Sequence, residues 1–205
     1  MGLKHFIRED EHVREAVAAM SFKEERILYF LEKGPVCTDE MLERAREIAE
    51  KRGIKSIVVA STRGATGVKA SEVFRGYNVV VVTHSVGFRE LNLQELTEEN
   101  RKKILANGAK ILTTTHAMGG VGRAVRRKFN TMQVDEMIAH TLRLFGEGMK
   151  VAIEIVLMAA DSGLIRTDED VISIGKYDTA IVVRPANAQD LFNLRVKEIL
   201  CKPLL

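Results

Sequence analysis

The sequence predicts an α/β fold, a three-layer α/β/α domain built around a mostly parallel, twisted sheet. From about residue 26, short apolar runs rich in valine and isoleucine alternate with longer amphipathic segments, and the connections between them are short. That alternation is typical of a parallel sheet whose right-handed crossover helices cover both faces. One run, NVVVVT at 78–83, is apolar almost throughout, as expected for a strand buried on both sides.

The expected strands are the apolar runs bounded by polar or glycine-containing segments. They lie at 27–32, 56–60, 78–83, 110–115, 171–175, 179–184 and 195–201. We expect the strand at 195–201 to return antiparallel at an edge of the sheet.

Helices fill the intervals between these strands. The first follows Thr38, whose hydroxyl suits an N-cap, and ends near Arg52, before a glycine that favours a left-handed stop. A short helix follows the loop at 61–67 and ends near Arg75. The remaining helices have apolar residues at helical spacing and are expected at 97–108, 133–145 and 149–161.

Residues 1–25 are predicted to form a separate N-terminal helical arm, and residues 26–205 a single α/β domain. In the arm, apolar residues recur at helical spacing within an otherwise charged segment: Val13, Ala16, Val17 and Met20. This amphipathic helix packs either on the sheet of its own subunit or on a neighbouring one. A homo-oligomer is therefore among the expected assemblies.

Composition narrows the class of protein. The chain has 205 residues, 46% of them hydrophobic, which is enough to bury a substantial core, and no apolar run is long enough to span a membrane. The formal net charge is only +3, so we expect no nucleic-acid partner. The densest basic stretch, 123–128, is either a solvated helix face or a phosphate-facing patch. Two distant cysteines and no secretion signal indicate a cytoplasmic protein without a metal site.

The connection after the second strand, STRGATG at 61–67, has the composition of an anion-binding loop. Helix N-termini present free backbone amides and a favourable dipole to anions, and hydroxyl side chains add donors. This loop has three hydroxyls, two glycines and no carboxylate. A plain helix cap is the alternative, and neither the Walker A nor the GxGxxG spacing is present. The predicted ligands of a phosphate group are Ser61, Thr62, Gly64, Thr66 and Gly67.

Two more strand ends carry candidate site residues, because ligands of open α/β sheets bind at the carboxyl ends of the strands. The candidates after the third strand are Thr83, His84, Ser85, Gly87 and Phe88. Those after the fourth are Thr115, His116, Ala117, Met118, Gly119 and Gly120.

Each of these candidates has a structural alternative. His84 and His116 are either catalytic or structural histidines, and Phe88 either stacks on a planar ring or covers the sheet edge. The glycine-rich loop either approaches a ligand closely or is a plain connection. No GxSxG elbow, HExxH pair or CxxC motif accompanies them.

A long stretch resembles the C-terminal α/β domain of pyruvate kinases. It is TDEMLERAREIAEKRGIKSIVVASTRGATGVKASEVFRGYNVVVVTHSVGF, and it is more similar still to stand-alone archaeal proteins named after that domain. The resemblance covers about residues 26–200. In pyruvate kinases the loop after the second strand cradles a phosphate of a sugar bisphosphate, and the resemblance assigns that role to residues 61–67. We expect no pyruvate kinase activity, because this length leaves no room for a catalytic barrel of about 200 residues or more.

For the stand-alone group, the resemblance implies bound FMN, a small phosphorylated ligand. Its phosphate would lie at 61–67 and its ring system across the strand ends near 83–88 and 115–120. The expected function is binding of this cofactor, with an oxidoreductase role on an unknown substrate. Two alternatives remain: a regulatory module that senses a sugar phosphate, and a hydrolase or transferase of phosphate esters that uses His84 or His116.

Overall fold

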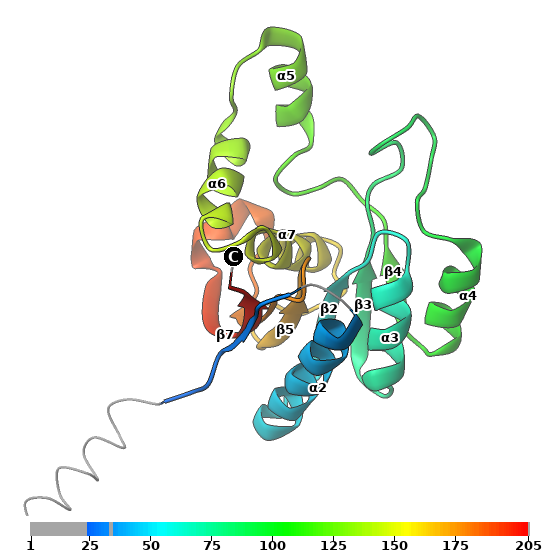
Figure 1. Ribbon diagram of the computed structural model, residues 1–205. Helices are drawn as coiled ribbons and strands as arrows, with labels where there is room; N and C mark the ends of the chain where they lie inside the picture. Colours follow the sequence, from blue (N-terminus) through cyan, green and yellow to red (C-terminus); the bar gives the residue numbers. More distant parts are fainter. Residues whose placement is uncertain (1–23, 33–34, 205) are drawn as a thin grey trace, which may run out of the picture.

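The computed structural model describes residues 24–32 and 35–204, so nearly all of the predicted N-terminal arm, residues 1–25, lies outside the described residues. Seven strands form one sheet in the order β1-β7-β6-β5-β2-β3-β4 (Figure 1). The predicted α/β fold with a mostly parallel sheet is confirmed. The strands are β1 (Leu28–Phe30), β2 (Ser56–Ala60), β3 (Asn78–Val82), β4 (Lys110–Leu112), β5 (Val171–Ile174), β6 (Ala180–Arg184) and β7 (Arg195–Pro203).

The antiparallel strand lies inside the sheet. β6 runs antiparallel to both of its neighbours, β5 and β7, and every other pair of adjacent strands is parallel. The prediction that the last strand returns antiparallel at an edge was therefore wrong, since β1 closes that edge and pairs in parallel with β7. The physical reason is the short connection at 175–179, which allows a hairpin between β5 and β6 but no crossover.

Six helices and one 3₁₀ helix are present in the described part of the chain. They are α2 (Pro35–Arg52), α3 (Ala65–Val73), α4 (Glu98–Ala106), α5 (Val121–Phe129), α6 (Val134–Arg143), α7 (Glu147–Asp161) and η1 (Ala188–Asn193). The basic stretch at 123–128, for which a solvated helix face was one of two interpretations, lies in α5, whereas η1 was not expected. The first helix begins at Pro35, before Thr38, because the fixed φ of proline suits a first helical turn. The Thr38 hydroxyl instead donates to Asp178 Oδ1 at 2.7 Å.

Two cores lie on opposite faces of the sheet. The first core joins the sheet to α2, α3 and α4, and the second joins it to α6 and α7. Adjacent residues of β2 alternate between them, since Ile57 and Val59 belong to the first core and Val58 to the second. Both faces of this strand are therefore buried, as in a parallel sheet that helices cover on each side.

The chain reverses its direction of travel across the sheet at β2. From β2, the chain passes through α3 to β3 and then through α4 to the edge strand β4. It then returns through α5, α6 and α7 to β5, on the other side of β2 (Figure 1). Open α/β sheets bind ligands at such a switch point, outside the carboxyl ends of the strands.

Candidate functional site

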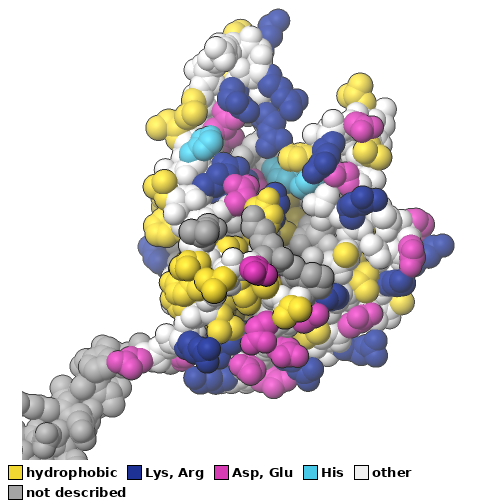
Figure 2. Space-filling view, viewed as in Figure 1, with side chains coloured by type: hydrophobic (Ala, Val, Ile, Leu, Met, Phe, Trp, Pro, Cys, Tyr) yellow, Lys and Arg dark blue, Asp and Glu magenta, His cyan; other side chains and the backbone are white. Residues whose placement is uncertain are grey.

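A pocket of about 390 Å³ lies at this switch point. Its walls come from the ends of β2 and β3, one side of α7 along most of its length and the turn between β5 and β6. A volume of this size falls in the range of small-molecule sites. In Figure 2, histidine side chains lie beside a hollow between the upper lobe, which carries α5 and α6, and the rest of the molecule.

The loop at 61–67 forms one end of the pocket. Ser61 is buried, and its Oγ accepts a hydrogen bond from the Gly67 amide at 3.0 Å, so this hydroxyl caps α3. The Ala65 and Thr66 amides have no acceptor among the described residues, and the side chains of Thr62 and Thr66 line the pocket. Ala65 does not line the pocket, so this end of it offers the free amide of Thr66 and two hydroxyls.

The two glycines of this loop are explained by packing inside the protein. Gly64 has a φ of +102°, and a Cβ there would lie 2.5 Å from the Cβ of Asn100 in α4. A Cβ on Gly67 would lie 2.8 Å from Cγ1 of Val81 in β3. Both residues are buried, and neither lines the pocket. Their role is to let α3 approach the sheet and α4.

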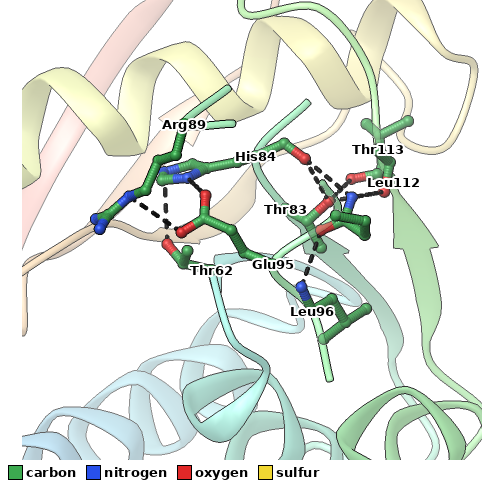
Figure 3. A network of polar contacts seen from close by, with 9 residues as sticks. Thr62, Thr83, His84, Arg89, Glu95, Leu96, Leu112 and Thr113 are labelled. Carbon is green, nitrogen blue, oxygen red and sulfur yellow. Dashed lines mark hydrogen bonds and ion pairs between the residues drawn. The ribbon is translucent and has the colours of Figure 1, made fainter. Parts of the chain in front are cut away.

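His84 follows β3 and is held by a carboxylate. Its Nδ1 lies 2.6 Å from Glu95 Oε2, and its Nε2 lies 3.4 Å from the Thr62 hydroxyl (Figure 3). The other oxygen of Glu95 accepts from Arg89 Nε at 3.1 Å. With Nδ1–H donating to Glu95, the neutral imidazole keeps a lone pair on Nε2, directed toward Thr62. This arrangement orients His84 as a base.

His116 is part of a second, more deeply buried network on α7. Glu154 accepts hydrogen bonds from the Met118 amide at 3.0 Å and from Lys150 Nζ at 2.5 Å, and its Oε2 lies 3.4 Å from His116 Nδ1. Lys150 and Glu154 are only 5% and 2% exposed. Burial alone would raise the pKa of Glu154, but the hydrogen bond from His116 and the charge of Lys150 outweigh it and lower that pKa to about 2.

One polar atom of this network has no partner. His116 Nε2 is buried and forms no hydrogen bond with any described residue. Because Nδ1 faces Glu154, Nε2 is the free acceptor of a neutral imidazole. Such an orphaned atom at the wall of a pocket is a natural contact for a ligand that carries a hydrogen-bond donor.

Three rings meet between the two networks. Phe88 lies 4.1 Å from the His84 ring centroid and stacks on His116 at 4.8 Å with an interplanar angle of 25°. The guanidinium of Arg123 lies over Phe88 at 4.9 Å from the ring centroid. The pocket thus has an aromatic wall, which meets its polar loop where His84 contacts Thr62.

Sequence comparison identifies the domain. The sequence pattern described as "Pyruvate kinase, alpha/beta domain" matches residues 39–183, well over half of the chain. The chain belongs to the pyruvate kinase alpha/beta domain family. The predicted resemblance to this domain is therefore confirmed.

Solved structures of whole pyruvate kinases are among the matches to this chain. A crystal structure of Cryptosporidium parvum pyruvate kinase is 14% identical with a TM-score of 0.39, and the match covers 76% of this chain and 24% of that one. A second C. parvum pyruvate kinase structure is 14% identical with a TM-score of 0.38, and the match covers 84% of this chain and 25% of that one. The structure of an NH3-dependent NAD synthetase from Campylobacter jejuni is 13% identical with a TM-score of 0.30, and the match covers 66% of this chain and 54% of that one. The chain thus spans about a quarter of the length of the pyruvate kinases it matches.

The pocket of this family member brings together some of the predicted site residues. Those that line it are Ser61, Thr62, Thr66, Thr83, His84, Phe88 and His116. Those that do not line it are Gly64, Gly67, Ser85, Gly87, Thr115, Ala117, Met118, Gly119 and Gly120. Among the latter, Gly120 is the N-cap of α5, and the buried Met118 reaches the wall of a neighbouring cleft.

Sequence reasoning missed the charged groups that hold the histidines. Glu95 lies in a long connection and gives no local signal. Lys150 and Glu154 do give a signal in the sequence, because they are charged residues four positions apart in the otherwise apolar segment of α7. A charged pair within an apolar helix face indicates a buried network.

No helix in the described residues is both long enough and apolar enough to cross a membrane.

Proposed function

We propose that this protein binds a phosphorylated cofactor, FMN, in the pocket at the carboxyl ends of β2, β3 and β5. One observation carries the proposal: a single pocket joins the donor-rich start of α3 to a cluster of aromatic rings. A nucleotide-like cofactor needs those two features in one site.

The polar end fits a phosphate group. The free amide of Thr66 and the hydroxyls of Thr62 and Thr66 are donors at a helix N-terminus, where the dipole favours an anion. Lys176 also lines the pocket and forms no ion pair with any described residue. These groups supply donors and a positive charge for a dianionic phosphate.

The other end fits a planar, mostly apolar ring system. Apolar side chains from the sheet and α7 line the pocket, among them Val82, Val151 and Ile155. His84 and Phe88, whose rings contact each other, add aromatic surface, and the unpartnered Nε2 of His116 is an acceptor for a ring N–H. When bound, a flavin supplies a ring that accepts and releases electrons. The two carboxylate-held histidines would orient this ring and accept a proton at Nε2.

One observation favours a second candidate, a hydrolase or transferase of phosphate esters. Thr62, His84 and Glu95 stand in the order hydroxyl, imidazole, carboxylate, which is the order of an activated nucleophile. The site lies beside the amides that would bind the phosphate. This candidate requires turnover of a phosphate ester that His84→Ala abolishes while ligand binding survives.

The absorbance spectrum of the protein as isolated tests the proposal. We expect flavin bands in the visible range, and release of a fluorescent flavin on denaturation. Protein isolated without flavin should bind added FMN, and Thr66→Val should weaken that binding whereas Thr66→Ser should not. Colourless protein that fails to bind added FMN would reject the proposal, and stronger thermal stabilisation by sugar phosphates than by FMN would favour a sensor of those molecules.

We further propose that the protein acts in the cytoplasm as a homo-oligomer, without a nucleic-acid partner. Large apolar side chains around α6 and η1 are exposed, among them Val134, Met137 and Phe192, and exposed apolar patches mark interaction surfaces. Both described cysteines are free thiols, as is usual in a reducing compartment. Light scattering after size exclusion should give an oligomer that Met137→Glu dissociates; a wild-type monomer would contradict this.

A further inference from the structure

A second cleft, of about 470 Å³, lies between α5, α6 and the loop that follows β4. Arginine is its most frequent lining residue. Four arginines line it, Arg123, Arg126, Arg127 and Arg143, against one carboxylate, Glu136. Figure 2 shows Lys and Arg side chains gathered on the side of the upper lobe that faces the hollow.

The positive charge of this cleft is only partly neutralised. Arg126 Nε lies 2.6 Å from Glu136, and Arg143 Nε lies 2.6 Å from Glu147. Arg123 and Arg127 form no ion pair with any residue that the structure describes. Two guanidinium groups therefore remain available at the cleft. The planar fork of a guanidinium matches the oxygens of a phosphate and binds them through paired hydrogen bonds.

Helix α5 places these charges together in spite of their repulsion. Arg123, Arg126 and Arg127 are three and four residues apart, so they share one face of a helix that has no buried residue. Like charges at this spacing destabilise a helix, and no apolar core compensates on α5. Glu136, which is 12% exposed, fixes Arg126 and also caps α6 through the Gln133 amide. An anion between these side chains would relieve the repulsion.

The apolar part of the lining indicates a small ligand. Phe88, Met118, Met132 and Ala139 contribute to the walls, so the cleft combines a cationic rim with apolar surface. A nucleic-acid partner would need an extended basic surface, whereas the net charge of the whole chain is only +3. A cleft of this volume suits a compact phosphate-bearing molecule instead.

We propose that this cleft is a second binding site, specific for a small molecule that carries a phosphate or pyrophosphate group. It adjoins the first pocket, because Phe88, Arg123 and Arg143 line both. Arg127 lines only the cleft, and Thr66 lines only the first pocket. The two sites can therefore be perturbed separately, and the proposal does not depend on what the first pocket binds.

Calorimetric titration of the full chain with inorganic pyrophosphate tests the proposal. We expect binding at the cleft whether or not the protein has been saturated with FMN. Arg127→Gln should weaken pyrophosphate binding about tenfold, because a charge-assisted contact is lost. The matched control is Arg101→Gln, an exposed arginine of α4 outside both sites, which should leave the affinity unchanged.

Further titrations distinguish the cleft from the first pocket and a small phosphate ligand from a nucleic acid. Arg127→Gln should leave FMN binding unchanged, and Thr66→Val should leave pyrophosphate binding unchanged. The proposal is overturned if pyrophosphate does not bind, if Arg127→Gln and Arg101→Gln bind it equally, or if saturation with FMN abolishes its binding. Tighter, Arg127-dependent binding of a single-stranded DNA oligonucleotide would assign the cleft to nucleic acid. Failure of FMN to bind would reject the first proposal and leave this test intact.

Discussion

Replacing Glu154 by glutamine should destabilise the protein through the charge that it leaves behind. The carboxylate is 2% exposed and accepts hydrogen bonds from Lys150 and the Met118 amide. In Glu154→Gln the shape is kept, but the ammonium of Lys150 loses its counter-charge inside α7. Breaking a buried pair in this way costs about 3–5 kcal/mol, whereas removing both charges together is about neutral. We therefore expect a large loss in Glu154→Gln and a recovery in Lys150→Met/Glu154→Gln.

The same carboxylate predicts an acid-sensitive stability. Its pKa is about 2 in the folded protein, against an ordinary value of 4.5. The folded pKa is depressed, so the stabilisation is complete above the ordinary value and is lost as the pH falls toward 2. A shift of this size corresponds to about 3 kcal/mol. Wild-type protein should lose that amount over this pH range, and the double variant should lack this component of the loss.

Urea denaturation followed by far-UV circular dichroism measures both effects, since the chain has no tryptophan to report unfolding by fluorescence. Glu154→Gln and the double variant are compared with wild type at neutral pH, and wild type and the double variant are compared again in acid. A loss below about 1 kcal/mol in Glu154→Gln would show that Lys150 and Glu154 are not a buried, coupled pair. An unchanged acid dependence in the double variant would show that Glu154 does not carry it.

Three further predictions follow from the described geometry. Thr66→Val should weaken FMN binding about tenfold, because a hydrogen bond to a charged group is lost, and fluorescence titration measures it. Gly67→Ala should lower the free energy of unfolding by about 1–3 kcal/mol, because the added Cβ would lie 2.8 Å from a valine of β3. The control Gly53→Ala meets no atom within 4 Å and should cost only its φ strain, about 1 kcal/mol. Urea denaturation compares the two variants, and equal losses would contradict the packing argument. Burial raises the pKa of the Cys201 thiol to about 12. A thiol reagent should therefore modify only Cys37 in the native protein and both cysteines in urea. Rapid reaction of Cys201 in the native protein would refute this.

The sequence was most informative where local pattern and burial agree. Apolar runs predicted β2 and β3, and the unbroken run of β3 also predicted burial on both faces, because a strand covered by helices on each side has no polar face. The position of the pocket followed from the same alternation of strands and helices, since the carboxyl ends of parallel strands meet at one edge.

The direction of β6 was predictable and was missed. Residues 175–179 are too few to hold a crossover, so β5 and β6 had to form a hairpin, and β7 then resumed the parallel direction. Helix α5 was foreseen only as one of two interpretations of the basic stretch at 123–128, although Val121, Val125 and Phe129 recur there at helical spacing. The helix buries no side chain, so its apolar residues do not mark a core-facing stripe.

The candidate site was only partly predictable. Thr62, Thr66 and His84 directly follow strands, so their meeting in one pocket follows from topology. Glu95 and Glu154 reach the histidines from a long loop and from a helix distant in sequence. Gly64 and Gly67 show the converse error, because a glycine-rich loop satisfied a ligand pattern while its glycines serve the packing of α3.

The central claim is that the start of α3 binds the phosphate of a ligand whose ring system occupies the aromatic end of the same pocket. Titrating the protein in parallel with FMN and with riboflavin, which differ only by that phosphate, tests this claim most directly. We predict that FMN binds at least about tenfold more tightly than riboflavin, as charge-assisted hydrogen bonds to the phosphate require. Equal affinity for the two molecules would contradict the claim.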